Sequence, residues 1–152
     1  NINNVKNIID IFNNENVEIV IHTGDISKAE TLKMFTDLKC QLVGVFGNND
    51  RSEEGLKEIS LLNNFNFQEP PLRLNLADKK IAIFDEPELI NSYIEEFKDV
   101  DLILHGHTHR YRHEIIDSTI YFNPGESAGL LKGKNAIGLV NLDNLDIKRI
   151  FF

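Results

Sequence analysis

Residues 102–109, with the sequence LILHGHTH, are the stretch from which the fold and the site of this chain can be inferred. The apolar run at 102–104 predicts a short buried strand, and Gly106 allows the chain to turn directly after it. His107 and His109 stand two residues apart, which places both imidazoles on one side of an extended chain. Because neutral imidazole is the commonest metal ligand, the pair indicates a metal site; a polar surface loop that happens to carry histidine is the alternative.

Helical and strand patterns alternate on both sides of this stretch. Ser27 with Glu30 three residues later predicts a capping box that opens the second helix, and 65–71 has no regular pattern. We expect helices at 5–12, 27–38, 54–62 and 88–98, and strands at 17–21, 42–46, 72–76, 81–84, 102–104, 113–116, 119–122, 136–141 and 146–151. An α/β first half followed by a β-rich second half predicts two packed sheets with helices outside.

Composition limits the class of protein. A chain of 152 residues with 41% hydrophobic content is expected to form one domain, 1–152. The single cysteine, Cys40, excludes an internal disulfide framework, and no apolar run is long enough to span a bilayer, so we expect a cytoplasmic protein without membrane association. The net charge of -8 argues against an extended nucleic-acid surface, although a site that holds cations could still bind a phosphate.

Polar residues follow several of the predicted strands. Asp25 comes after the strand at 17–21, Asn48 after 42–46, Asp85 after 81–84, and the two histidines after 102–104. The carboxyl ends of parallel strands meet at one edge of a sheet, so these side chains can converge. Their mixture of carboxylate, amide and imidazole suits Mn, Fe, Ni or Zn better than Mg or Ca. Helix capping is the competing role for Asp25, because a helix is expected to begin nearby.

The motifs Gly24-Asp25, Gly47-Asn48-Asn49-Asp50 and Gly106-His107-Thr108-His109, in that order and spacing, resemble those of the calcineurin-like metallophosphoesterases. The similarity is greatest to the small single-domain phosphodiesterases of bacteria and archaea, and the loop 123–129 is also similar to one of theirs. The resemblance implies an αββα sandwich of two mixed β-sheets flanked by helices, with two adjacent divalent metal ions. Carried over by position, Asp25 bridges the metals, Asn48 and His107 bind the second, and His109 binds the first.

The sequence departs from the family at its start. The family opens with a strand that ends in Asp-x-His, both residues being ligands of the first metal, and this sequence begins beyond that motif. Without the motif, the first metal would keep only Asp25 and His109, and the sheet would lack a central strand. We therefore expect the natural protein to have residues before Asn1, and the activity of the 152-residue chain to be impaired.

A second departure is at Asp85-Glu86, where the family has His-Gly and the histidine binds the second metal. A carboxylate at this position can still act as a ligand and would shift the preference toward a harder metal such as Mn. The alternative is that the ligand has been lost and the second site is weak. The sequence leaves both open.

The resemblance implies phosphodiester hydrolysis, with a hydroxide bridging the two metals as the nucleophile. Many relatives have a histidine where Asn49 stands, and an amide cannot donate a proton to the leaving group, so we expect small phosphodiester or nucleotide-like substrates with good leaving groups. Asp50 is expected to orient ligands. Arg51 and Arg110 adjoin the motifs and could contact the substrate phosphate, or could be solvated surface residues.

The main alternative function is a binding or scaffold module that keeps the fold without turnover, as in a subunit of the retromer coat. The altered Asp85-Glu86 segment favours this alternative, whereas Asp25, Asn48, His107 and His109 together favour the enzyme. A nucleotide-binding regulator is a weaker third hypothesis, because the chain has no P-loop glycine motif. Relatives often form homo-oligomers, but no interface pattern is visible in the sequence.

Overall fold

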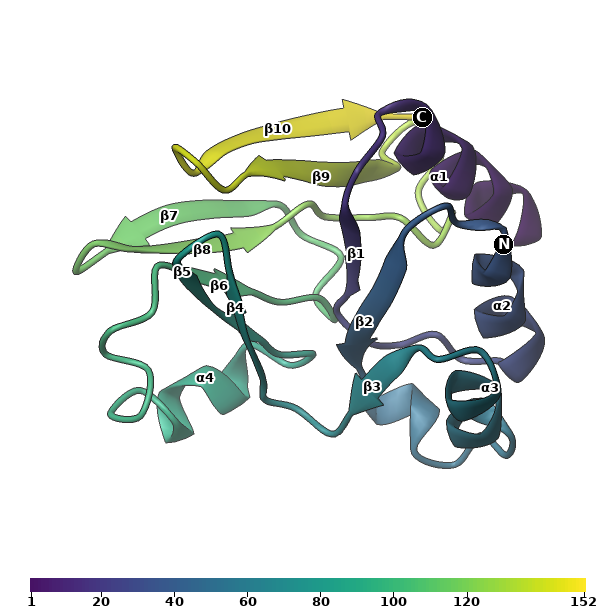
Figure 1. Cartoon of the computed structure of the whole chain (residues 1–152), viewed down its shortest axis with the longest axis horizontal. Helices are drawn as coiled ribbons and strands as arrows, with labels where there is room; N and C mark the ends of the chain where they lie inside the picture. The colour runs from purple at the N-terminus through teal and green to yellow at the C-terminus, as the bar shows by residue number, and fades with distance from the viewer.

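The computed structural model describes residues 1–152 as two β-sheets packed between helices (Figure 1). The helices are α1 (Ile2–Asn14), α2 (Ala29–Met34), α3 (Leu56–Leu62) and α4 (Glu88–Ser92), with short 3-10 turns η1 (Phe35–Asp37) and η2 (Asn48–Asp50). The strands are β1 (Ile19–His22), β2 (Gln41–Val45), β3 (Asn66–Gln68), β4 (Leu72–Leu76), β5 (Lys79–Ile83), β6 (Leu102–Leu104), β7 (Arg112–Ile116), β8 (Thr119–Asn123), β9 (Ala136–Asn141) and β10 (Asp146–Phe151).

The two main sheets differ in direction. The first has the order β1-β2-β3 and is parallel throughout. The second has the order β4-β5-β6-β8-β7, in which β5, β6 and β8 are parallel and the outer strands β4 and β7 run antiparallel to their neighbours. Strands β9 and β10 pair with each other as an antiparallel hairpin. All residues of β6 and β8 are buried, as expected for parallel strands covered on both faces.

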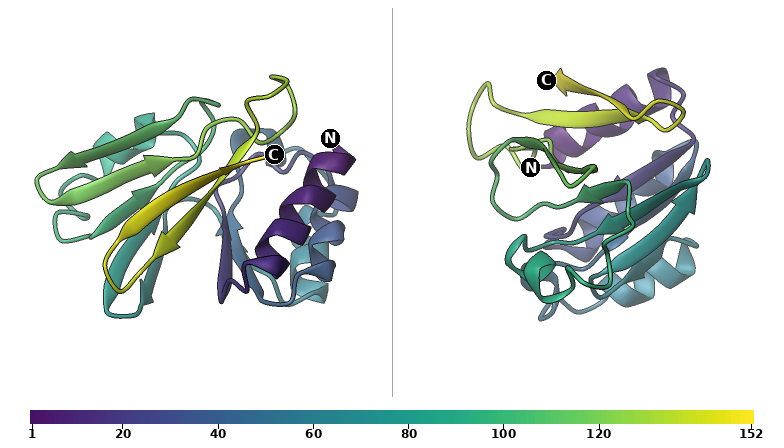
Figure 2. Two further views of the ribbon diagram at one scale, coloured as in Figure 1. Left: turned by 90° about the horizontal axis from the view of Figure 1, so that it is seen from above. Right: turned by 90° about the vertical axis from the view of Figure 1, so that its left-hand side faces the viewer.

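Three hydrophobic clusters correspond to the three interfaces between layers, which Figure 2 shows edge-on. The first cluster joins α1, α2 and α3 to the first sheet, for example through Ile9, Leu32 and Leu42. The second lies between the sheets, where Val43 and Val45 pack with Ile83 and Phe122, and it includes partly buried residues of the β9–β10 hairpin. The third joins the second sheet to the α4 region. The predicted αββα sandwich is confirmed.

Local sequence explains several elements. Asn1 caps α1, because its side chain accepts a hydrogen bond from the backbone N–H of Asn3 at 3.1 Å. The strands predicted at 72–76 and 81–84 form a hairpin, β4 and β5, and both residues of its turn, Ala77 and Asp78, have the positive φ of a tight hairpin turn. None of the helices is both long enough and apolar enough to cross a bilayer.

Three predicted elements were wrong in detail. Ser27 does not cap the second helix: its φ is 71°, its N–H donates to Asp50 Oδ1 at 2.7 Å, and α2 begins only at Ala29. The segment 65–71 contains the strand β3, which is three residues long and therefore too short to show a pattern, and which pairs with β2. Helix α4 ends at Ser92, although Phe97 beyond it stays buried against the second sheet, so the apolar spacing there reflects burial without a continuous helix.

Candidate metal centre

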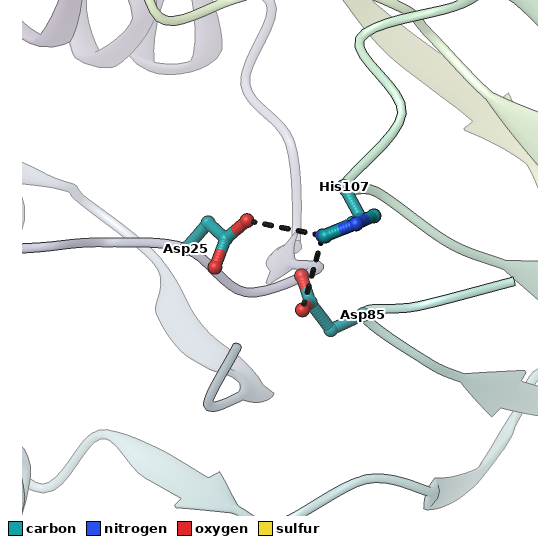
Figure 3. A group of neighbouring side chains, drawn as sticks. All are labelled: Asp25, Asp85 and His107. Carbon is teal, nitrogen blue, oxygen red and sulfur yellow. Dashed lines mark ion pairs between the residues drawn. The ribbon is translucent and has the colours of Figure 1, made fainter. Parts of the chain in front are cut away.

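Loops from both sheets bring three potential metal ligands together. Asp25 follows β1 in the first sheet, whereas Asp85 and His107 follow β5 and β6 in the second. One ligand atom from each of the three residues lies within 4.8 Å of the others, and Figure 3 shows the side chains turned toward a common point. His107 Nδ1 lies 3.5 Å from Asp25 Oδ2 and 3.9 Å from Asp85 Oδ2. The predicted convergence at the strand ends is therefore found for these three residues.

Glycine at two positions permits this close approach of the loops. A Cβ atom on Gly24, which has a φ of 101°, would lie 2.4 Å from Asp85 Oδ1. A Cβ atom on Gly47 would lie 2.3 Å from the backbone nitrogen of Asp25. Any side chain at either position would push the loops apart, so the glycines of the two motifs are needed for packing around the site.

Several residues of these loops have a positive φ, as do residues in turns elsewhere in the chain. Asp25, Ser27, His107 and His109 all have positive φ values, of 57°, 71°, 61° and 54°. Residues other than glycine rarely adopt this region, and such positions cluster at functional sites where the surrounding contacts hold them. Asp25, His107 and His109, the ligands expected from the motifs, therefore share a backbone conformation that the contacts around them must hold.

Asp85 has the electrostatics expected of a cation ligand. Its side chain is 1% exposed, Oδ2 accepts a hydrogen bond from the Asn48 N–H at 3.1 Å, and Oδ1 has no hydrogen-bond partner. Burial, reinforced by the neighbouring charge of Asp25, raises the pKa of Asp85 to about 6. A divalent cation between these carboxylates would relieve both the repulsion and the missing contact, so the residues present fit a metal ion.

The turn η2 contributes in two ways. Asn48 is exposed, and its backbone N–H holds Asp85 as described above. Asp50 is 4% exposed, and its two oxygens accept hydrogen bonds from the N–H groups of Ser27, at 2.7 Å, and Gly47, at 2.8 Å. Asp50 thus joins the loops that follow β1 and β2, and its oxygens point to backbone donors.

His109 lies outside the group of three. Its Nδ1 is 2.5 Å from Oε2 of Glu126, a residue for which the sequence analysis predicted no role. Burial acts to raise the pKa of Glu126, but the hydrogen bond from His109 and those from backbone N–H groups outweigh it and lower the pKa. The sequence did contain a signal for Glu126: it is an acidic residue directly after Pro124-Gly125, in the loop that resembles one of the family's.

Asn123 is a second residue that the sequence analysis did not assign. Its buried side-chain amide donates to the backbone carbonyl of Gly106 at 2.9 Å and to Thr108 Oγ1 at 3.3 Å. Because these acceptors flank His107, Asn123 fixes the turn that carries this histidine. Nothing in the sequence indicates that β8 ends beside the histidine loop; this follows from the parallel pairing of β6 with β8.

The two arginines differ in their surroundings. The Arg51 guanidinium lies 3.9 Å from Glu69 and 3.8 Å from Glu86, and its side chain is 56% exposed. It therefore lies between two carboxylates, one of which immediately follows Asp85 in the chain. Arg110 is exposed, and its backbone N–H donates to Thr108 Oγ1 at 3.3 Å.

Comparisons with known proteins agree with this arrangement. Residues 1–145 match the calcineurin-like phosphoesterase superfamily domain. Phosphodiesterase MJ0936 of Methanocaldococcus jannaschii is 31% identical over 149 residues, which are 97% of this chain and 90% of that protein.

Solved structures show the same fold. An archaeal phosphodiesterase is 30% identical, covers 99% of this chain and 92% of its own, and superposes with a TM-score of 0.87. Wild-type Vps29 from Entamoeba histolytica, in complex with Zn²⁺, is 19% identical over 97% of this chain and 88% of its own, with a TM-score of 0.63, a likeness of fold alone.

Proposed function

Because the chain belongs to the calcineurin-like phosphoesterase superfamily, we propose that it is a metal-dependent phosphodiesterase with a dinuclear metal centre formed by the loops after β1, β2, β5 and β6. The observation that carries the proposal is the group formed by Asp25, Asp85 and His107, whose ligand atoms lie within 4.8 Å of one another. We include Asn48 and His109 as further ligands from their positions in the family motifs.

The residues have distinct tasks in this proposal. Asp25 would be a ligand shared by both ions, while Asn48, Asp85 and His107 would hold one ion and His109 the other. When bound, the divalent ions supply an activated water and positive charge for the phosphoryl oxygens. Asp85 in place of an imidazole makes the ligand set harder, so manganese is the metal we propose, with Ni, Fe or Zn as the alternatives.

The chain's own residues also limit the substrate. Asn49, whose N–H donates to Asp25 Oδ1 at 3.1 Å, has no acidic proton for a leaving group. A diester whose leaving group departs without protonation, such as an aryl diester, is therefore the preferred small substrate. Arg51, beside the site and 56% exposed, can turn from Glu86 toward a substrate phosphate, and Arg110 is an exposed second candidate.

The test is hydrolysis of an aryl phosphodiester with added Mn²⁺, compared with an alkyl diester, by this chain and by a version in which the family's strand ending in Asp-x-His precedes Asn1. In the version with the Asp-x-His strand we expect turnover of the aryl diester, its loss in EDTA, and a fall in kcat/KM of about 100-fold or more on His107→Ala. The matched control is His113→Ala, which removes an exposed histidine on β7 and should leave the rate unchanged.

Two results would contradict the proposal. Equal rates in wild type and His107→Ala would remove the histidine loop from the chemistry. Failure of the version with the Asp-x-His strand to hydrolyse any diester with every divalent metal tried would favour the scaffold alternative, for which the Asp85-Glu86 departure and the fold shared with Vps29 are the supporting observations.

A further inference from the structure

Glu126 is a buried carboxylate at the edge of the candidate metal centre. Its side chain is 2% exposed, and Oε2 lies 2.5 Å from His109 Nδ1. The other oxygen, Oε1, accepts hydrogen bonds from the N–H groups of Gly129 at 2.8 Å and Leu130 at 3.2 Å. Both oxygens are therefore engaged, and the carboxylate cannot rotate without breaking one set of contacts.

The backbone that carries Glu126 is itself fixed to two other elements. The Glu126 carbonyl accepts a hydrogen bond from the Ala136 N–H at the start of β9, at 2.7 Å. The carbonyl of Ser127 accepts one from the side-chain amide of Asn4 in α1, at 3.1 Å. The carboxylate is thus held by a loop tied to the hairpin on one side and to a helix on the other, which makes it a rigid support for His109.

The consequence for His109 is a defined choice of ring nitrogen. With Nδ1 occupied by Glu126, only Nε2 is free, and the side chain is 38% exposed. His107 is arranged in the opposite sense, because its Nδ1 faces Asp25 and Asp85. The two histidines of one motif therefore present different nitrogens to the site. Only His109 is hydrogen-bonded to a carboxylate through its other ring nitrogen.

We propose that Glu126 is a positioning residue: its hydrogen bond holds the His109 ring with Nδ1 protonated and Nε2 directed to a metal ion. A carboxylate that accepts the second ring N–H fixes the tautomer and makes the free nitrogen a better ligand. The inference rests on the proposed function for the presence of the metal, while the contact between Glu126 and His109 stands on the geometry alone.

The first test needs neither metal nor substrate. Nitrogen-15 NMR of the histidine rings in metal-free protein at pH 8 reports which nitrogen carries the proton, and comparison with His109→Ala assigns the signals. We expect the proton of His109 on Nδ1, and we expect Glu126→Gln to redistribute it between the two nitrogens. A wild-type ring protonated on Nε2 with Nδ1 bare would overturn the proposal.

The second test measures Mn²⁺ affinity by calorimetry in a double-mutant cycle, made in the version that carries the family's Asp-x-His strand before Asn1. Glu126→Gln should weaken binding by about 10- to 100-fold in the wild-type background and by nothing further in His109→Ala. Glu114→Gln is the matched control, because it changes an exposed glutamate, paired with Arg112 on β7, and should leave the affinity unchanged. Unfolding of each metal-free variant by urea shows that all are compared as folded proteins.

The outcomes separate the inference from the function on which it rests. An equal loss in both backgrounds, or no loss in either, would overturn the role of Glu126 while leaving the metal centre in place. No Mn²⁺ binding by the wild-type protein would overturn the proposed metal centre and the role of Glu126 toward it, even with the proton of His109 on Nδ1.

Discussion

The loops after β2 and β5 each carry a buried aspartate, yet the two carboxylates have different hydrogen-bonding states. Asp50 has one backbone donor for each oxygen, from Ser27 and Gly47. Asp85 has a single donor, from Asn48, and its Oδ1 has none. Burial alone therefore does not distinguish a ligand from a structural residue. A carboxylate with a backbone N–H donor for each oxygen, such as Asp50, has a structural role. A buried carboxylate with one oxygen left without a donor, such as Asp85, can still bind a cation.

The largest effect expected from this comparison concerns Asp50. Replacing it by alanine leaves two backbone N–H groups without acceptors, in the loops that follow β1 and β2, and should lower the free energy of unfolding by about 4 kcal/mol. Urea unfolding followed by circular dichroism measures the loss. Asp143→Ala, at an exposed position in the β9–β10 turn, is the control and should change stability by less than about 0.5 kcal/mol. A loss as small for Asp50 would show that its hydrogen bonds do not hold the loops together.

Asp85 should behave in the opposite way in the metal-free protein. Its pKa is raised to about 6 in the folded state from the ordinary value of 3.8, so the folded state binds the proton more tightly than the unfolded state. The stabilisation is present below about pH 4 and is lost as the pH rises through about 6. Asp85→Asn removes this loss and should exceed wild type in stability by about 2 to 3 kcal/mol at pH 8, and by much less at pH 4.

Urea unfolding in EDTA between pH 4 and pH 8 checks this prediction, because the effects of groups that do not interact with Asp85 cancel in the difference between wild type and Asp85→Asn. A difference in free energy of unfolding that stays constant over this range would show that the charge of Asp85 does not destabilise the folded protein. Asp85→Asn should also bind Mn²⁺ more weakly, so the substitution would raise stability and lower metal affinity.

The contrast also shows what the sequence could predict. Apolar periodicity located the strands β1, β2, β5 and β6, and the motif glycines and polar residues after them predicted the edge where Asp25, Asp85 and His107 meet. Local patterns are sufficient for this, because burial of one face imposes them. Asp50 and Asp85, however, have similar positions in the sequence, one at the end of Gly47-Asn48-Asn49-Asp50 and one directly after Phe84.

The difference in hydrogen bonding between these two aspartates depends on contacts between segments distant in the chain. Ser27 is 23 residues from Asp50, and Asn48 is 37 residues from Asp85. The same limitation explains the misplaced helix start at Ser27, whose N–H is taken by Asp50, and the unassigned Glu126, which meets His109 across 17 residues. Hydrogen-bond partners of this kind are determined by the packing of the sheets, and no local pattern specifies them.

The smallest expected effect gives the most direct test of whether Asp85 is a ligand. At pH 6 its pKa of about 6 leaves the carboxyl about half protonated, and a bound cation must displace that proton, so saturation with Mn²⁺ should release about half a proton more from wild type than from Asp85→Asn. Calorimetry in two buffers of different ionisation enthalpy measures the difference, and the same pair at pH 8 is the control, where the excess should vanish. Proton release that Asp85→Asn leaves unchanged at pH 6 would mean that the ion does not reach this carboxylate. The replacement of the family's histidine by Asp85 would then have removed a metal ligand, and Asp85, like Asp50, would have only a structural role.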